Sequence, residues 1–123
     1  MNFLSIENLT KSYGERMIFA DLTFGIDQGQ KVAIVAKNGA GKTTTMRILS
    51  TLFSPSKGKV SICGIDVTEN PNEARKKIGF LTGSSGLYHR LTPNELIKYF
   101  ADLYHVPKEQ FEARKTYLYD LLN

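Results

Sequence analysis

The chain has 123 residues, of which 41% are hydrophobic and 23% charged, and its formal net charge is +4 at pH 7. This composition is typical of a water-soluble globular domain, and the length allows one modest domain but not two. Neither a run of 18 apolar residues nor a signal-peptide pattern is present, so we expect no membrane span and no export. The mild basic excess disfavours a nucleic-acid-binding domain, and Cys63, the one cysteine, is expected to be a small core residue.

Two segments near the amino end have the alternating pattern of half-buried strands. Leu4 and Ile6 alternate with polar residues, and after a turn around Gly14 the residues Leu22 and Phe24 begin a second alternation. This pattern predicts a sheet with one buried face.

A third segment, residues 31–35, is a short continuous apolar run after Lys31. Such a run predicts a strand that is covered on both faces. A glycine-rich stretch, residues 36–44, follows directly, and residues 45–53 then place Met46, Leu49 and Phe53 at helical spacing. The glycine-rich stretch is therefore predicted to be a strand-to-helix loop.

A loop of this kind can bind phosphate. Glycines let successive backbone N–H groups approach an anion, and the following helix adds unpaired N–H groups and the positive end of its dipole. Lys42 would add a charge for the outer phosphates and Thr43 a hydroxyl for Mg²⁺. The predicted nucleotide-binding residues of the loop are Ala36, Lys37, Asn38, Gly39, Ala40, Gly41, Lys42, Thr43 and Thr44.

The loop departs from the pattern G-x-x-x-x-G-K-[ST] because Ala36 replaces its first glycine. Alanine is tolerated at negative φ and costs more at positive φ, so we expect weaker nucleotide binding rather than none. A plain glycine turn without a ligand is the alternative.

The remaining segments suggest structure rather than chemistry. Residues 77–81 are expected to form a short buried strand, and Thr92-Pro93-Asn94-Glu95 is a capping box that starts a helix. Core positions of that helix are predicted at Leu96, Tyr99, Phe100 and Leu103, and a second helix is predicted after Pro107. Asp66 is expected at the polar edge of a hairpin strand rather than on a metal, and His89 and His105 at the surface.

Several of these segments together resemble a known family. Leu9-Thr10-Lys11-Ser12-Tyr13-Gly14, the stretch from Lys37 to Thr44, Pro55-Ser56-Lys57-Gly58 and Ile62 to Val67 occur in the order and spacing of the amino-terminal half of the ATP-binding subunit of ABC transporters. The resemblance implies an α/β P-loop NTPase fold of ABC type, incomplete in this chain. Residues 1–82 would form the antiparallel β subdomain with the phosphate loop, and residues 83–123 a Q-loop-like region and the start of a helical arm.

The resemblance also implies roles for single residues. Tyr13 would stack on the adenine of ATP, and Thr43 would bind Mg²⁺. Gly83 stands where the family has a glutamine that contacts magnesium and the attacking water. Glycine has no side chain for that role, which puts the family's usual coupling of hydrolysis to the permease in doubt. Two short segments resemble the sequences of the sodium-extruding, Nat-type branch of the family: Gly-Phe-Leu-Thr-Gly, which ends at Gly83, and the later Gly-Leu-Tyr.

The implied function is that of the ATP-binding subunit of an exporter, which energises transport, here sodium efflux, by binding and hydrolysing ATP. Such a subunit is cytoplasmic, lies on the inner face of the membrane against a permease, and pairs with a second ATP-binding subunit. The family's second acidic strand, signature sequence and later histidine do not occur, so we expect a fragment that binds ATP without hydrolysing it. The alternatives are a soluble family member acting on DNA or ribosomes and a non-catalytic nucleotide-binding fragment.

Overall fold

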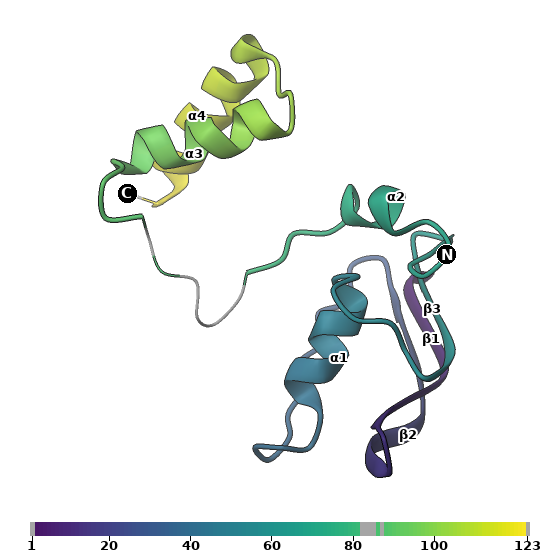
Figure 1. The fold of residues 1–123 in the computed structure, drawn as a ribbon. Helices are drawn as coiled ribbons and strands as arrows, with labels where there is room; N and C mark the ends of the chain where they lie inside the picture. Colours follow the sequence, from purple (N-terminus) through teal and green to yellow (C-terminus); the bar gives the residue numbers. More distant parts are fainter. Residues whose placement is uncertain (1, 82–85, 87, 123) are drawn as a thin grey trace. The chain divides into compact units, whose positions relative to one another are not determined.

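The structure is a computed structural model that describes residues 2–81, 86 and 88–122 (Figure 1). The chain divides into two compact units, Met1–Leu81 and Thr82–Asn123. Each unit has its own secondary structure.

The first unit is built on a four-stranded antiparallel sheet. Its strands are β1 (Asn2–Tyr13), β2 (Arg16–Asp27), β3 (Lys57–Ile62) and β4 (Ile65–Asp66). Their order in the sheet is β2-β1-β3-β4, so β1 and β3 are the central strands. The two predicted alternating strands are confirmed as β1 and β2, which meet at a turn where Gly14 has a φ of 58°.

The core of this unit lies between the sheet and the helices α1 (Lys42–Leu49) and α2 (Pro71–Arg75), which Figure 1 shows beside the strands. Its buried hydrophobic residues are Ile6, Leu9, Ile48, Val60, Ile62, Val67 and Ala74. Burying a side chain of valine, leucine or isoleucine size contributes roughly 1.5–3 kcal/mol, and partly buried hydrophobic residues such as Phe19 and Leu49 pack against this cluster. Ile48 brings the carboxyl half of α1 into the core, and this contact places the start of α1 as well.

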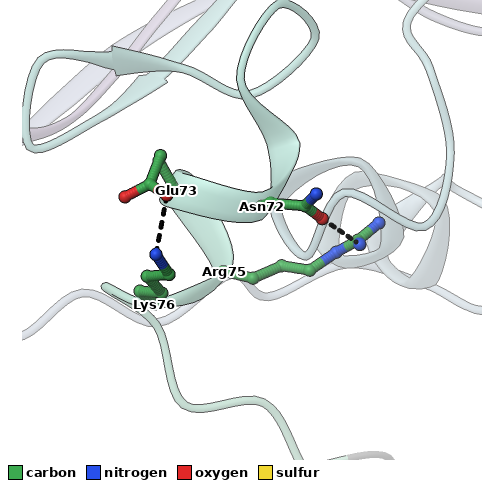
Figure 2. Close-up of polar contacts among 4 residues, drawn as sticks. All are labelled: Asn72, Glu73, Arg75 and Lys76. Atoms are coloured by element: carbon green, nitrogen blue, oxygen red, sulfur yellow. Dashed lines mark hydrogen bonds and ion pairs between the residues drawn. The ribbon is translucent and has the colours of Figure 1, made fainter.

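Polar contacts attach α2 to the end of α1. Within α2 and its C-cap, Arg75 donates to Asn72 Oδ1 at 3.1 Å and Lys76 pairs with Glu73 at 2.7 Å. Figure 2 marks both contacts with dashed lines. Arg75 also donates to the side-chain hydroxyl and the carbonyl oxygen of Thr51, which follows α1. The Lys76–Glu73 pair is exposed and adds little stability, whereas the bonds from Arg75 to Thr51 link α2 to the end of α1 beside the shared core that includes Ile48 and Ala74.

The predicted strands at residues 31–35 and 77–81 are wrong. Neither segment is a strand; Val35 is 91% exposed and Leu81 87% exposed. A strand that is buried on both faces needs hydrogen-bonded neighbours on both sides, and the four described strands pair only with one another. Both segments therefore present apolar side chains to solvent.

Asp66 and Cys63 both lie in the β3–β4 hairpin. Asp66 ends β4 and accepts the backbone N–H groups of Thr68 and Glu69 at 2.8 and 3.1 Å, which confirms it as the polar end of a hairpin strand. Cys63 is half-buried and packs against the core. Across the described residues no group of three or more His, Cys, Asp or Glu side chains could hold a metal ion.

The second unit consists of the helices α3 (Pro93–Leu103) and α4 (Lys108–Leu122), at the two predicted positions. Tyr119 of α4 donates to Asn94 Oδ1 of α3 at 2.8 Å. Three of the four predicted core positions of α3 are wrong, because Tyr99, Phe100 and Leu103 are 50%, 46% and 56% exposed, whereas Leu96 is half-buried. Two helices form a single layer, which cannot enclose an apolar stripe. His89 and His105 are exposed, as expected.

The predicted capping box at the start of α3 is confirmed. Thr92 Oγ1 accepts the backbone N–H of Glu95, and the Glu95 carboxylate accepts the backbone N–H of Thr92 at 2.8 Å. The backbone bond first, and then the Thr92 hydroxyl, hold the pKa of Glu95 below its ordinary value of 4.5.

This pKa gives α3 a pH dependence. A carboxyl whose pKa is lower in the folded than in the unfolded state stabilises the fold above its unfolded pKa, and that stability is lost as pH falls through the folded pKa. We expect the helical Cα shifts of the first turn of α3, followed by NMR, to decline at acidic pH, and Glu95→Gln to remove most of this decline. Glu109→Gln in the first turn of α4 is the matched control; equal pH responses of the two variants would contradict the assignment.

Candidate functional site

The glycine-rich loop joins residues 31–35 to α1 through a tight turn. Ala40 donates its backbone N–H to the carbonyl oxygen of Lys37 at 3.2 Å, which closes the turn. Gly39 and Gly41 have φ values of 85° and 91°. Because side chains disfavour this left-handed region, the two glycines are what allow the chain to fold back here.

Gly41 also packs closely against β2. A Cβ atom at this position would lie 2.8 Å from Ile18 Cγ2 and 2.7 Å from Phe19 Cδ1. Carbon atoms do not approach this closely without displacement, and Gly41 itself is buried. The loop is therefore fixed to β2 at a point where only glycine fits.

The start of α1 has no capping side chain. Gly41 is the N-cap residue, no side chain accepts the free amides, and the first turn contains no acidic residue. The hydroxyl and backbone N–H of Thr45 both donate to the carbonyl oxygen of Gly41, at 2.9 and 2.8 Å. The N–H groups of the first turn and the positive end of the helix dipole are thus available to an anion.

A cavity of about 520 Å³ lies at this end of α1. It is lined by Tyr13, Arg16, Ile18, Lys37, Asn38, Gly39, Gly41, Lys42, Thr43 and Thr44. Three of these residues are cationic and none is acidic, and the lining also includes one aromatic ring. A cavity with this lining suits a ligand that carries several negative charges at one end and a flat apolar group at the other.

The structure brings most of the predicted site residues together around this cavity. Tyr13, from the end of β1, joins seven of the nine predicted loop residues, whereas Ala36 and Ala40 do not line the cavity. Gly83 lies outside the described residues.

Two lining residues, Arg16 and Ile18, were missed from the sequence. Both are on β2: Arg16 pairs with Tyr13 across the β1–β2 turn, and Ile18 lies at a shift in the register between the pairs Lys11–Phe19 and Ser12–Met17. The short turn around Gly14, which pairs Arg16 with Tyr13, could have indicated Arg16, whereas the irregular register that places Ile18 has no signal in the sequence.

The backbone conformation explains why alanine is tolerated at position 36, where the phosphate-loop pattern has glycine. Among the described residues, the non-glycine positions with positive φ are Asn8, Asp21, Thr51, Cys63 and His105. Ala36 is therefore free of the strain that a left-handed alanine would suffer.

Comparisons with known proteins identify the family. The ABC transporter family model matches residues 19–121. The ABC transporter ATP-binding protein NatA of Bacillus subtilis is 39% identical over 95 residues, which are 76% of this chain and 39% of that protein. Nod factor export ATP-binding protein I of Ralstonia nicotianae is 32% identical over 111 residues, 90% of this chain and 35% of that protein.

A solved structure of an ATP-binding subunit of an ABC transporter superposes with a TM-score of 0.80 at 30% identity, covering 91% of this chain and 47% of that one. The chain belongs to the ABC transporter family and has the P-loop NTPase fold of its ATP-binding subunits, in part. It spans less than half the length of these relatives. None of the helices in the described part of the chain is long and apolar enough to span a membrane.

The packing of Gly41 predicts different outcomes for two glycine substitutions. Gly39→Ala meets nothing within 4 Å and should cost only the backbone strain of positive φ, about 1 kcal/mol. Gly41→Ala adds overpacking against Ile18 and Phe19 and should cost roughly 1–3 kcal/mol more. Urea unfolding of the full chain measures both free energies; equal losses would show that β2 does not hold the loop.

Proposed function

We propose that this chain binds ATP in the cavity at the start of α1, with the phosphates on residues 37–44 and the adenine on Tyr13. The observation that carries the proposal is the meeting of an uncapped helix N-terminus, the Lys42 ammonium and an aromatic ring around one cavity without acidic residues. Charge-assisted hydrogen bonds are worth about 1.5–3 kcal/mol each, so a few of them can hold a triphosphate.

Magnesium would enter this site with the nucleotide. Thr43 contributes a hydroxyl to the cavity lining, and the lining has no carboxylate that could bind the ion without phosphate. Mg²⁺ retains several waters and commonly takes its remaining ligands from phosphate oxygens, so one hydroxyl fits as an added ligand of the ATP complex. When bound, the ion would neutralise charge that develops on the transferred phosphoryl group.

Isolated, the chain is proposed to bind ATP but not to hydrolyse it. Hydrolysis needs a group that orients and deprotonates the attacking water, and no residue of the cavity lining is acidic or a histidine. Lys42 and the backbone amides can bind and orient the phosphates, but they cannot accept a proton while they hold them.

In the whole protein, the proposed role is to energise transport. Family membership supports an ATPase-type subunit, and we propose that it acts on the cytoplasmic face of the membrane with a permease and a second ATP-binding subunit. The resemblance of the segment that ends at Gly83 to the sodium-extruding, Nat-type branch supports sodium efflux as the process that is driven. The 39% identity to the ABC transporter ATP-binding protein NatA supports the role as an ATP-binding subunit. The relative from Ralstonia nicotianae is named for the export of Nod factor, a different cargo. Sodium efflux is therefore tested by measuring sodium transport by the complete transporter.

Two ligands separate the parts of the proposed site. Lys42→Ala removes the ammonium that would hold the outer phosphates, so affinity for both magnesium ATP and magnesium tripolyphosphate should fall about tenfold or more. Tyr13→Ala should weaken only ATP, by roughly 5- to 100-fold, because tripolyphosphate has no base to stack. Isothermal titration calorimetry on the full chain measures both; unchanged ATP affinity in Lys42→Ala would remove the phosphate site.

The absence of hydrolysis is tested separately. Phosphate release from ATP by the pure chain should not exceed that of the Lys42→Ala variant. Sustained turnover by the unmodified chain alone would show that some group in it acts as the base.

A further inference from the structure

Lys11 lies on β1, two residues before Tyr13, and therefore on the same face of the strand. Its ammonium nitrogen is 5.0 Å from the centroid of the Tyr13 ring, within cation–π distance. The same nitrogen donates to the carbonyl oxygen of Ser54 at 2.7 Å. One lysine side chain thus joins the tyrosine ring to the segment that follows α1.

The Ser54 carbonyl is itself held near β1. Ser56 donates its backbone N–H to the carbonyl oxygen of Thr10 at 2.9 Å, and Ser12 donates its backbone N–H to Ser56 Oγ at 3.1 Å. These bonds on either side of Lys11 fix the distance between Ser54 and the strand. The ammonium is therefore anchored to the backbone rather than to a mobile side chain.

The charge of Lys11 is not used elsewhere. The ion pairs of the described residues involve Lys76, Lys98 and Lys115, and none includes Lys11. Tyr13 lines the cavity and is 48% exposed, whereas Lys11 does not line the cavity. The ammonium therefore contacts the ring from a residue outside the cavity lining, and about half of Tyr13 remains exposed.

We propose that Lys11 is a positioning residue for base recognition, which holds the Tyr13 ring so that a purine can stack on the surface facing the cavity. This inference rests on the proposed ATP site, to which it adds a residue that contributes to specificity for the base. A ring held in place before binding loses less conformational freedom when the base arrives, so affinity for the base increases while affinity for the phosphates does not.

A merely electrostatic role for Lys11 would have a different signature. A lysine that only adds positive potential near the cavity would strengthen binding of any polyphosphate, with or without a base. The two roles are separated by comparing magnesium ATP with magnesium tripolyphosphate.

The test uses the full chain and isothermal titration calorimetry with both ligands. Lys11→Met, which keeps the length of the side chain, should weaken ATP about two- to fivefold, the range of an exposed cation–π contact, and leave tripolyphosphate unchanged. Lys11→Arg should bind ATP as tightly as the unmodified chain, because a guanidinium can contact both the Tyr13 ring and the carbonyl oxygen of Ser54. In a Tyr13→Ala background, Lys11→Met should have no further effect. Lys59→Met, at an exposed lysine of β3, controls for the loss of one charge.

Each result decides the proposal. Equal weakening of ATP and tripolyphosphate by Lys11→Met, or an unchanged ATP affinity, overturns the positioning role while leaving the ATP site intact. If Lys11→Met does not fold, the ATP affinity of Lys11→Arg decides the positioning role. An affinity below that of Lys59→Met overturns the role, and an affinity equal to that of the unmodified chain supports it. Failure of the unmodified chain to bind either ligand overturns the ATP site and this inference together.

Discussion

The contact between Gly41 and strand β2 is the constraint on which the site depends. Ile18 and Phe19 leave no room for a Cβ atom at Gly41, so the backbone of the loop lies directly on the strand. The same strand starts at Arg16, next to the turn that carries Tyr13. Packing at one glycine thereby places an uncapped helix end and an aromatic ring around one cavity, although Tyr13 and the loop are far apart in sequence.

This arrangement leaves groups unsatisfied that a purely structural helix would cap. An N-cap glycine without a side-chain acceptor and a first turn without acidic residues both forgo stabilisation that serine, threonine or aspartate supplies at other helix starts. The start of α3 shows the contrast, because there Thr92 and Glu95 satisfy each other's backbone N–H groups. The open end of α1 and the cations around it are consistent with a bound anion, which would supply the missing acceptors.

The sequence predicted the local features of the fold and site that depend on neighbouring residues. Alternation gave β1 and β2, the capping box gave the start of α3, and the glycines with Lys42 gave the loop. The prediction of a strand from Lys31 to Val35 was wrong. Apolar composition indicates a buried strand, but a strand also needs neighbouring strands to pair with, and none of the described strands pairs with this segment. Arg16 was missed for a related reason: its place at the cavity follows from its pairing with Tyr13, which is a property of the folded hairpin.

The most direct test of the account is to record the backbone amide NMR spectrum of the full chain while magnesium ATP is added. The account predicts that the amide signals of residues 38–44 shift first and most, together with those around Tyr13, and that signals of α4 stay in place. Shifts confined to other parts of the chain, or no shifts at saturating ATP, would contradict the assignment of the phosphate site to this loop.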